Sequence, residues 1–246
     1  MRVLTWNLYH GRDLPAATDV NRPLLDEFAA VLDRLEWDVA LLQEAPPRWF
    51  DALSRATRST GARVLTSRNW WPWLQRKVAD WNPDLVKSSE GGSNQILVRT
   101  PGRVVEHRRL TLARWPERRR MHWVRLDGGV CVANLHASAG RPARAAVEVL
   151  RAARAALDWS GADPLVFGGD LNLRPRHDPE PFEQLRGALG LGDPTGADAI
   201  DHLLARGLRV VREPRQLAVE EREVEDAEGV RVRLSDHAPV LAEFVR

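Results

Sequence analysis

The chain has 246 residues, 43% of them hydrophobic, so it is long enough to bury a sizeable core. Its single cysteine, Cys131, excludes an intramolecular disulfide, and no apolar run is long enough to span a membrane. The formal net charge of +2 is weak evidence for a polyanionic partner. Because Met1 leads directly into a strand pattern without a basic and apolar leader, we expect a cytoplasmic protein.

The first third of the chain alternates apolar strands with helices. We expect strands at residues 3–8 and 39–42, a helix that Asp19 or Asn21 caps and that runs to Leu35, and a helix from Pro47 to about Thr57 that closes near Gly61. The apolar residues of the first helix recur at helical spacing, which predicts that it covers a sheet.

Residues 66–92 have a different composition from the rest of the chain. Tryptophans alternate there with basic residues: Trp70, Trp71, Trp73 and Trp81 lie among Arg68, Arg76, Lys77 and Lys87. We interpret this stretch as an insertion in a single domain that spans residues 1–246, since no internal repeat or low-complexity linker divides the chain. The tryptophans could stack on bases, and packing in a small core or binding an apolar lipid tail explains them equally well.

The remaining elements are expected in the following order. Strands cover residues 95–99 and 104–112, a basic loop covers 114–120, a hairpin covers 122–126 and 130–135, a helix covers 142–159, and later elements are a short helix at 181–189, a strand at 199–204 and a last strand that ends at Val245. Val147, Leu150 and Leu157 are predicted to form the inner stripe of the long helix. The acidic run at 220–228 is interpreted as a solvated excursion.

One strand ends in a way that packing does not require. Residues 165–167 are apolar and run into Gly168-Gly169, after which Asp170 and Asn172 follow two residues apart. The glycines let the backbone turn sharply or approach a ligand closely, and in an extended backbone the two polar groups would point to one side. An ordinary turn, in which Asp and Asn bond their own backbone, explains this stretch equally well when it is taken alone.

Polar residues recur at the ends of other apolar strands. The full set is Asn7, Glu44, His136, Asp170, Asn172, Asp201, Asp236 and His237. Each alone has a local explanation, such as a turn or a hydrogen-bonded core histidine. Four of them are acids, which cannot share a pocket without positive charge between them. Their oxygen ligands suit Mg²⁺, or Mn²⁺ in its place, better than Zn²⁺, so we predict a divalent-cation site that serves phosphate chemistry.

Six segments in this order resemble the endonuclease/exonuclease/phosphatase family: Thr5-Trp6-Asn7, Leu42-Gln43-Glu44, Asn134-Leu135-His136, Gly169-Asp170-Leu171-Asn172, Ile200-Asp201-His202 and Ser235-Asp236-His237-Ala238-Pro239. The ordered set is highly specific, although no single motif is. The resemblance implies a four-layer α/β sandwich, in which two mixed β-sheets pack face to face, helices flank them, and the site lies at one end of the sheets.

The resemblance also implies which residues hold the metal and which move the proton. Glu44 would be the principal Mg²⁺ ligand, with Asn7 and Asp236 close to the metal. His237 would polarise or deprotonate the attacking water. Asp201 would hold the imidazole of His237 in the required tautomer and raise its basicity.

The other matched residues would face the phosphoryl group. Asp170 and Asn172 would orient the water and a phosphoryl oxygen. His136 would donate to the phosphate or to the leaving oxygen and so oppose the charge that develops there. Abasic-site enzymes of the family use a tyrosine at this position, so His136 argues against a close relationship with them.

We therefore expect a Mg²⁺-dependent phosphoesterase, most simply a nuclease that cleaves phosphodiester bonds. Six arginines are candidates for contacts with nucleic-acid phosphates: Arg108, Arg109, Arg114, Arg118, Arg119 and Arg120. Hydrolysis of an inositol, sugar or lipid head-group phosphate is the alternative, and these arginines would then be a solvated rim. A catalytically silent binding protein is less expected, because every acid and histidine of the pattern is present. A monomer is favoured.

Overall fold

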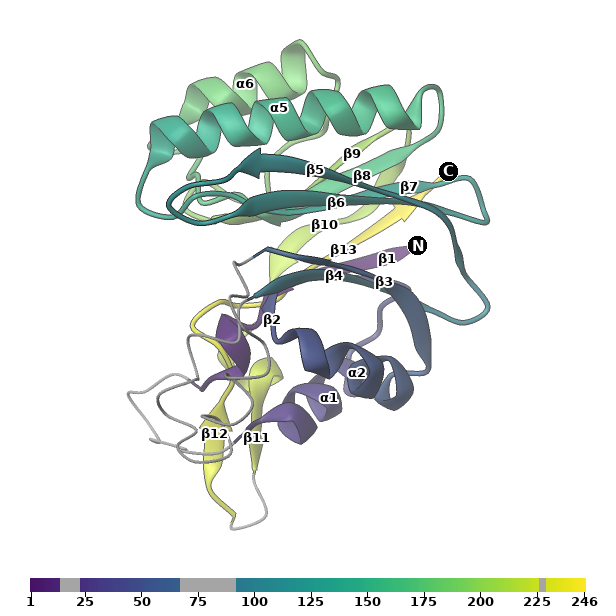
Figure 1. Cartoon of the computed structure of the whole chain (residues 1–246), viewed down its shortest axis with the longest axis vertical. Coiled ribbons are helices and arrows are strands. Elements are labelled where there is room, and N and C mark those ends of the chain that lie inside the picture. Colours follow the sequence, from purple (N-terminus) through teal and green to yellow (C-terminus); the bar gives the residue numbers. More distant parts are fainter. Residues whose placement is uncertain (14–22, 67–91, 226–228) are drawn as a thin grey trace.

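The structure is a computed structural model that describes residues 1–13, 23–66, 92–225 and 229–246. Two mixed β-sheets of six and five strands pack face to face, and in the described residues two α-helices cover the outer face of each sheet (Figure 1). This arrangement confirms the predicted four-layer α/β sandwich. Apart from Thr66 and Gly92, the predicted Trp-rich insertion lies outside the described residues.

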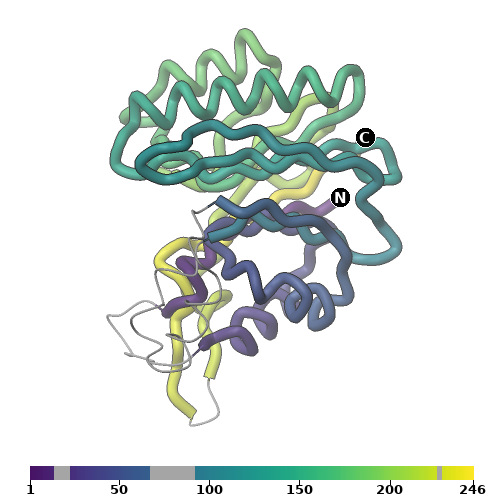
Figure 2. The backbone as a smooth tube through the Cα atoms, viewed as in Figure 1, coloured from purple at the N-terminus to yellow at the C-terminus, as the bar shows by residue number. Residues whose placement is uncertain are grey.

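The six-stranded sheet contains both ends of the chain. Its order is β10 (Arg209–Gln216), β13 (Val240–Val245), β1 (Arg2–Asn7), β2 (Val39–Ala45), β4 (Ser93–Arg99) and β3 (Ser59–Leu65). The first and last strands, β1 and β13, pair antiparallel, so the two termini lie close together (Figure 2). This pairing places the first and last strands of the chain next to each other in one sheet.

The five-stranded sheet is formed by a continuous part of the chain. Its order is β5 (Val104–Ala113), β6 (Arg119–Leu126), β7 (Cys131–His136), β8 (Leu165–Asp170) and β9 (Asp201–Arg206). Only β7 and β8 pair in parallel among these strands. A separate two-stranded ribbon consists of β11 (Glu223–Glu225) and β12 (Arg231–Arg233).

The helices bury one face each, as their apolar spacing dictates. Helices α1 (Leu25–Arg34) and α2 (Phe50–Ala56) cover the six-stranded sheet, and α5 (Pro142–Ser160) and α6 (Pro179–Gly187) cover the five-stranded one (Figure 1). Short 3₁₀ turns η1 (Tyr9–Gly11), η2 (Pro47–Trp49) and η3 (Val219–Arg222) connect other elements. None of the described helices is both long and apolar enough to cross a membrane.

The predicted inner face of α5 is wrong at Val147, whereas Leu150 and Leu157 are partly buried and pack against the core. Val147 is 67% exposed, whereas Ala145, Val149 and Ala152 are fully buried against the five-stranded sheet. The alanines let the helix lie close to a sheet surface that already carries the large ring of Trp123, so small side chains complete the packing. The spacing of the large apolar residues did not indicate this buried face, because alanine is small and only weakly hydrophobic.

The sequence did not reveal two edge strands. The helix from Pro47 was expected to close near Gly61 and no strand was predicted at residues 59–65 or 209–216, but these residues form β3 and β10. Both strands have one neighbour, and β10 is largely exposed with three polar residues in its second half. Pairing with β4 and β13 therefore determines their conformation more than their own pattern does.

Two predicted loops are also partly regular structure. The basic loop at 114–120 ends early, because Arg119 and Arg120 already belong to β6. The acidic run at 220–228 is partly packed where it is described. Glu220 and Glu225 are exposed, but Glu223 lies in β11, where Arg233 Nη2 approaches its Oε1 to 2.9 Å. This ion pair across the ribbon holds Glu223, so the run is not simply a solvated excursion.

A polar layer connects the two sheets near one end of the sandwich. The amide of Asn134 on β7 donates to the carbonyl oxygens of Leu42 on β2 and Gln95 on β4, at 3.0 and 2.9 Å, and accepts from Gln43 Nε2 at 2.8 Å. These groups are fully buried, where each hydrogen bond avoids a desolvation cost of about 1–3 kcal/mol. Gln43 and Asn134, which have no predicted catalytic role, thus fix how the sheets are aligned.

His122 on β6 is a buried histidine without a hydrogen-bond partner. Its side chain is fully buried, neither ring nitrogen is bonded, and the ring of His107 on β5 lies edge-on with centroids 5.5 Å apart. Its register neighbours are Asn134 on β7 and Arg109 on β5. Burial, with a smaller effect of His107, lowers the pKa of His122 to about 3, so the ring is neutral in the folded protein at physiological pH.

We predict that His122 makes folding sensitive to acid. Its pKa rises from about 3 in the folded state to about 6.5 on unfolding, so only the unfolded state binds the proton between these values. The contribution of neutral His122 to the free energy of unfolding is fully present above about pH 6.5. Below this pH the free energy of unfolding falls by up to about 1.4 kcal/mol for each pH unit. In urea unfolding at pH 7.5, 6 and 5, a His122→Leu variant should lose less stability than wild type on acidification. Parallel loss in both proteins would contradict this.

Candidate active site

Strand ends from both sheets meet at one end of the sandwich. In the six-stranded sheet β1 and β2 are parallel, with Asn7 beside Gln43. In the five-stranded sheet His136, Asp170 and Asp201 lie in register across β7, β8 and β9. Parallel strands end at the same edge, so residues far apart in the sequence converge.

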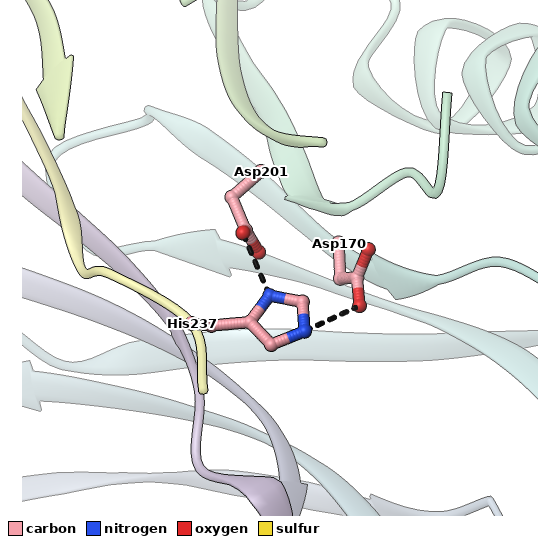
Figure 3. A group of neighbouring side chains, drawn as sticks. All are labelled: Asp170, Asp201 and His237. Carbon is pink, nitrogen blue, oxygen red and sulfur yellow. Dashed lines mark hydrogen bonds and ion pairs between the residues drawn. The ribbon is translucent and has the colours of Figure 1, made fainter. Parts of the chain in front are cut away.

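Asp201 and His237 form a hydrogen-bonded pair in the site. His237 Nδ1 lies 2.8 Å from Asp201 Oδ2, and its other nitrogen, Nε2, points toward Asp170 Oδ2 at 3.9 Å (Figure 3). Burial alone would lower the pKa of His237, but the bond to Asp201 and the charges of Asp170 and Asp236 raise it to about 10. The imidazole is therefore held in one orientation with Nε2 directed into the site.

The backbone of His237 is anchored from three elements. Trp6 Nε1 on β1 and Arg222 Nη1 on η3 donate to its carbonyl oxygen at 3.0 and 2.9 Å. Ser235 Oγ accepts from the backbone N–H of His237 at 3.0 Å and donates to the carbonyl oxygen of Asn7 at 2.7 Å. Ser235 takes a left-handed φ of 61°. These bonds fix the loop that carries His237 to the end of β1.

Asp170 lies fully inside the site at the end of β8. Asn7 Nδ2 donates to its Oδ2 at 3.0 Å, and the backbone N–H of Asn172 donates to its Oδ1 at 3.1 Å. Burial, followed by the neighbouring carboxylate of Asp201, raises the pKa of Asp170. A carboxylate at this position is thus costly unless positive charge is nearby.

Gly169 is required for this position of Asp170. Its φ is +124°, and a Cβ at this residue would lie 2.0 Å from the carbonyl oxygen of Leu135 on β7. The close approach lets β8 pair with β7 up to its last residue, where Asp170 is presented. This outcome agrees with the close backbone approach expected from the two glycines.

Glu44 and His136 lie on the other side of Asp170. His136 Nε2 is 3.7 Å from Glu44 Oε1 and 3.5 Å from Asp170 Oδ2. Arg119 Nη1 lies 2.8 Å from Nδ1 and 3.0 Å from Nε2 of the His136 ring. Burial, and then the charge of Arg119, holds the pKa of His136 well below its usual value, so the imidazole is neutral.

Asn172 and Asp236 are less closely involved. The side chain of Asn172 donates from Nδ2 to the carbonyl oxygen of Ala137 at 3.2 Å, so this residue contacts Asp170 through its backbone. The side chain of Asp236 is 40% exposed, and its Oδ1 lies 3.9 Å from His237 Nε2. The structure therefore brings six of the eight predicted site residues into one connected group and leaves Asn172 and Asp236 at its edge.

The chemistry of the group fits a divalent cation. Asp170, Asp201 and His237 each offer a ligand atom within 4.8 Å of the others. Asp201 Oδ1 is buried without a hydrogen-bond partner, and the pKa of Asp170 is raised because negative charges crowd a buried space. A cation would neutralise these charges. These three residues were predicted to be catalytic. The predicted metal ligand Glu44 is not among them: its Oε1 lies 3.7 Å from His136 Nε2, which is 3.5 Å from Asp170 Oδ2.

Two residues of the site were not among the predicted catalytic or metal-binding residues. Arg119 was expected in a basic loop, as one of six candidates for phosphate contacts, yet only 9% of it is exposed and it contacts His136. His10 had no predicted role, yet its Nε2 lies 3.1 Å from Glu44 Oε2. The signal for His10 was available, since it follows Asn7 at a strand end in the same polar-after-apolar pattern. No local signal distinguishes Arg119 from its neighbouring arginines.

Comparison with known proteins agrees with this geometry. The model of the Endonuclease/Exonuclease/phosphatase family matches residues 4–237. The chain belongs to this family. No curated protein matches it in sequence. The family includes, as its description says, both nucleases and phosphatases.

Several solved structures share the fold of this family member. A mannosyl-6-phosphatase from Bacteroides thetaiotaomicron has a TM-score of 0.72 and 16% identity, with 100% of both chains covered. The human Nocturnin catalytic domain has a TM-score of 0.67 and 16% identity, covering 100% of this chain and 94% of that one. TDP2 from C. elegans has a TM-score of 0.64 and 16% identity, covering 100% and 75%. At these identities the likeness is one of fold.

Substitution of Gly169 is predicted to disrupt the site through the backbone. In Gly169→Ala the new methyl group meets a β7 carbonyl oxygen at an unfavourable φ, so we expect a loss of more than about 3 kcal/mol in unfolding free energy. Gly187→Ala on α6 is the matched control, because nothing lies within 4 Å of its added Cβ, and it should change stability by less than about 1 kcal/mol. Equal denaturation midpoints for the two variants would contradict the close-approach argument.

Proposed function

We propose that this family member is a divalent-metal-dependent phosphoric-ester hydrolase in which His237 activates the attacking water. The observation that carries the proposal is the pair formed by buried Asp201 and partly buried His237, with Nδ1 and Oδ2 2.8 Å apart and Nε2 directed toward Asp170. A carboxylate bonded to one ring nitrogen leaves the other free to exchange a proton with water. Turn or packing roles do not require this arrangement.

Glu44, with Asn7 and Asp236, would hold Mg²⁺, or Mn²⁺ in its place. Their carboxylate and amide oxygens are the ligands that these hard cations prefer. When bound, the metal supplies positive charge that polarises the phosphoryl group and opposes the charge developing on it. The same positive charge would offset the field of the acids that keeps His237 protonated, and so favour its base form.

The protein's own residues divide the remaining work. His237 accepts the proton of water at Nε2, and Asp201 holds the ring and stabilises the imidazolium that forms. Asp170, whose Oδ1 accepts the backbone N–H of Asn172 at 3.1 Å, and Asn172 would orient the water and a phosphoryl oxygen. These roles need no movement of the backbone.

His136 and Arg119 would bind the phosphoryl oxygens. The His136 ring is neutral, because burial and Arg119 lower its pKa, so it can donate one N–H to a phosphoryl or leaving oxygen. Arg119 contributes a permanent charge beside it. Together they would stabilise the negative charge that grows during in-line attack.

Nucleic acid is the first substrate that we propose, cleaved as a phosphodiester. The arginines clustered between residues 108 and 120 support a polyanionic substrate, because guanidinium groups contact phosphates. A phosphomonoester of a sugar, inositol or lipid head group is the second candidate, and the fold similarity to a mannosyl-6-phosphatase favours it. Cytoplasmic location and a monomeric state remain predictions.

A substrate panel tests the proposal. Purified protein is incubated with supercoiled plasmid, single-stranded oligonucleotide, bis-p-nitrophenyl phosphate, p-nitrophenyl phosphate and mannose 6-phosphate, each with Mg²⁺ or EDTA. We expect cleavage of the diesters that EDTA and His237→Ala abolish. Turnover of the monoesters alone would overturn the nuclease assignment, and the absence of turnover on any substrate would favour a silent binding protein.

Two variants separate metal binding from proton transfer. In Glu44→Gln we expect the Mg²⁺ concentration for half-maximal activity to rise about 10- to 100-fold, because a ligand charge is lost. In Asp201→Asn we expect the maximal rate at saturating Mg²⁺ to fall about 10²- to 10⁴-fold, because the amide no longer stabilises the imidazolium. Both are measured in Mg²⁺ titrations of the hydrolysis rate. Identical profiles for the two variants would refute the division of roles.

A further inference from the structure

The turn that follows β1 has an unfavourable backbone conformation. Three consecutive residues, Tyr9, His10 and Gly11, have left-handed φ values of 47°, 55° and 77°. For the two residues with side chains this costs about 1–2 kcal/mol each. Such a conformation persists only when the surrounding structure holds it, and it often marks a functional site.

Neighbouring groups of the site hold this turn in place. The backbone N–H of Tyr9 donates to Asn7 Oδ1 at 3.0 Å. The side-chain amide of Asn7 in turn donates from Nδ2 to Asp170 Oδ2. The backbone N–H of Leu8 donates to the carbonyl oxygen of Gln43 at 2.9 Å. The turn is therefore tied to Asn7 on one side and to the residue that precedes Glu44 on the other.

The result is a contact between His10 and Glu44. His10 Nε2 lies 3.1 Å from Glu44 Oε2, while Glu44 Oε1 lies 3.7 Å from His136 Nε2. Glu44 itself has a left-handed φ of 49°. Gly92 packs against both residues: a Cβ at this position would lie 3.4 Å from Glu44 Cα and 3.7 Å from His10 Cε1. One carboxylate oxygen thus contacts the turn, and the other lies on the side of His136.

We propose that His10 is a positioning residue that holds Glu44 Oε2 and thereby presents Oε1 to the metal. This inference rests on the proposed function, in which Glu44 is a metal ligand. Groups that bind the outer atom of a ligand reduce the orientations available to it, and losing them typically weakens metal binding about 10- to 100-fold. The strained turn is explained by this role, because a relaxed backbone would not bring the imidazole to Glu44.

His10 acts through Glu44 and is not a member of the group formed by Asp170, Asp201 and His237. Within the described part of the chain, the group of acids and histidines with ligand atoms within 4.8 Å of one another consists of Asp170, Asp201 and His237. His10 Nε2 already faces Glu44 Oε2.

Two substitutions of His10 test the proposal. His10→Asn keeps a residue that tolerates the left-handed backbone but is too short to reach Glu44, whereas His10→Gln places an amide N–H near the position of Nε2. Mn²⁺ binding is measured directly by electron paramagnetic resonance, and the hydrolysis rate is titrated with Mg²⁺. His177→Asn, at an exposed histidine, is the control, and circular dichroism checks that each variant is folded.

We expect His10→Asn to weaken Mn²⁺ affinity at least tenfold, with a maximal rate at saturating Mg²⁺ within about threefold of wild type. His10→Gln and His177→Asn should bind Mn²⁺ within about threefold of wild type. Backbone preference alone predicts the opposite order, because Asn suits a left-handed φ better than Gln. In a Glu44→Gln background, His10→Asn should cause no further loss.

Different results identify which idea fails. Wild-type protein that binds no Mn²⁺ would overturn the proposed function and this inference with it. Wild-type protein that binds Mn²⁺, with His10→Asn binding equally well, would overturn the role of His10 alone. The role of His10 would also be overturned if His10→Gln were as weak as His10→Asn, or if His10→Asn kept its full effect without the Glu44 carboxylate.

Discussion

The site depends on the alignment of two sheets that pack face to face. Each sheet has one parallel pair at its centre, β1 with β2 and β7 with β8, and the carboxyl ends of these pairs meet at one end of the sandwich. The buried amide of Asn134 bonds three groups of the opposite sheet. A shift of one sheet along the other would leave these groups unpaired at a cost of about 1–3 kcal/mol each, so the polar layer maintains the alignment on which the distances in the site depend.

The convergence of charged side chains has an electrostatic cost that shapes the chemistry. Asp170 and Asp201 are almost completely buried and close together, which raises the pKa of Asp170. His237 offsets part of this charge, and Arg119 lies beside His136 on the opposite side of Asp170. Buried carboxylates and a buried arginine therefore lie close together in this site. Such a site suits a cation and a phosphoryl oxygen bound next to each other.

Backbone strain is concentrated around the same site. Outside glycine, the residues with left-handed φ in the described chain are Tyr9, His10, Glu44, Arg58, Asn172 and Ser235. All except Arg58 belong to the site or to the segments that hold it. Their combined cost of several kcal/mol is a large fraction of the stability of a typical domain, so the packing of the sandwich must compensate for it. This distribution is expected where geometry is retained for function at the expense of stability.

Most of the sandwich and the polar strand ends could be predicted from local pattern, because buried strands and amphipathic helices bury their apolar residues at fixed periods. The edge strands β3 and β10 could not, since their conformation comes from pairing with β4 and β13. The residue types at the strand ends, together with the family resemblance, determined that acids, amides and histidines would form a phosphate-type site. Only the tertiary structure decided that Arg119 is buried beside His136 and that His10 meets Glu44. Such contacts join segments far apart in the chain, and their distances are set by how the sheets and the strained turn pack.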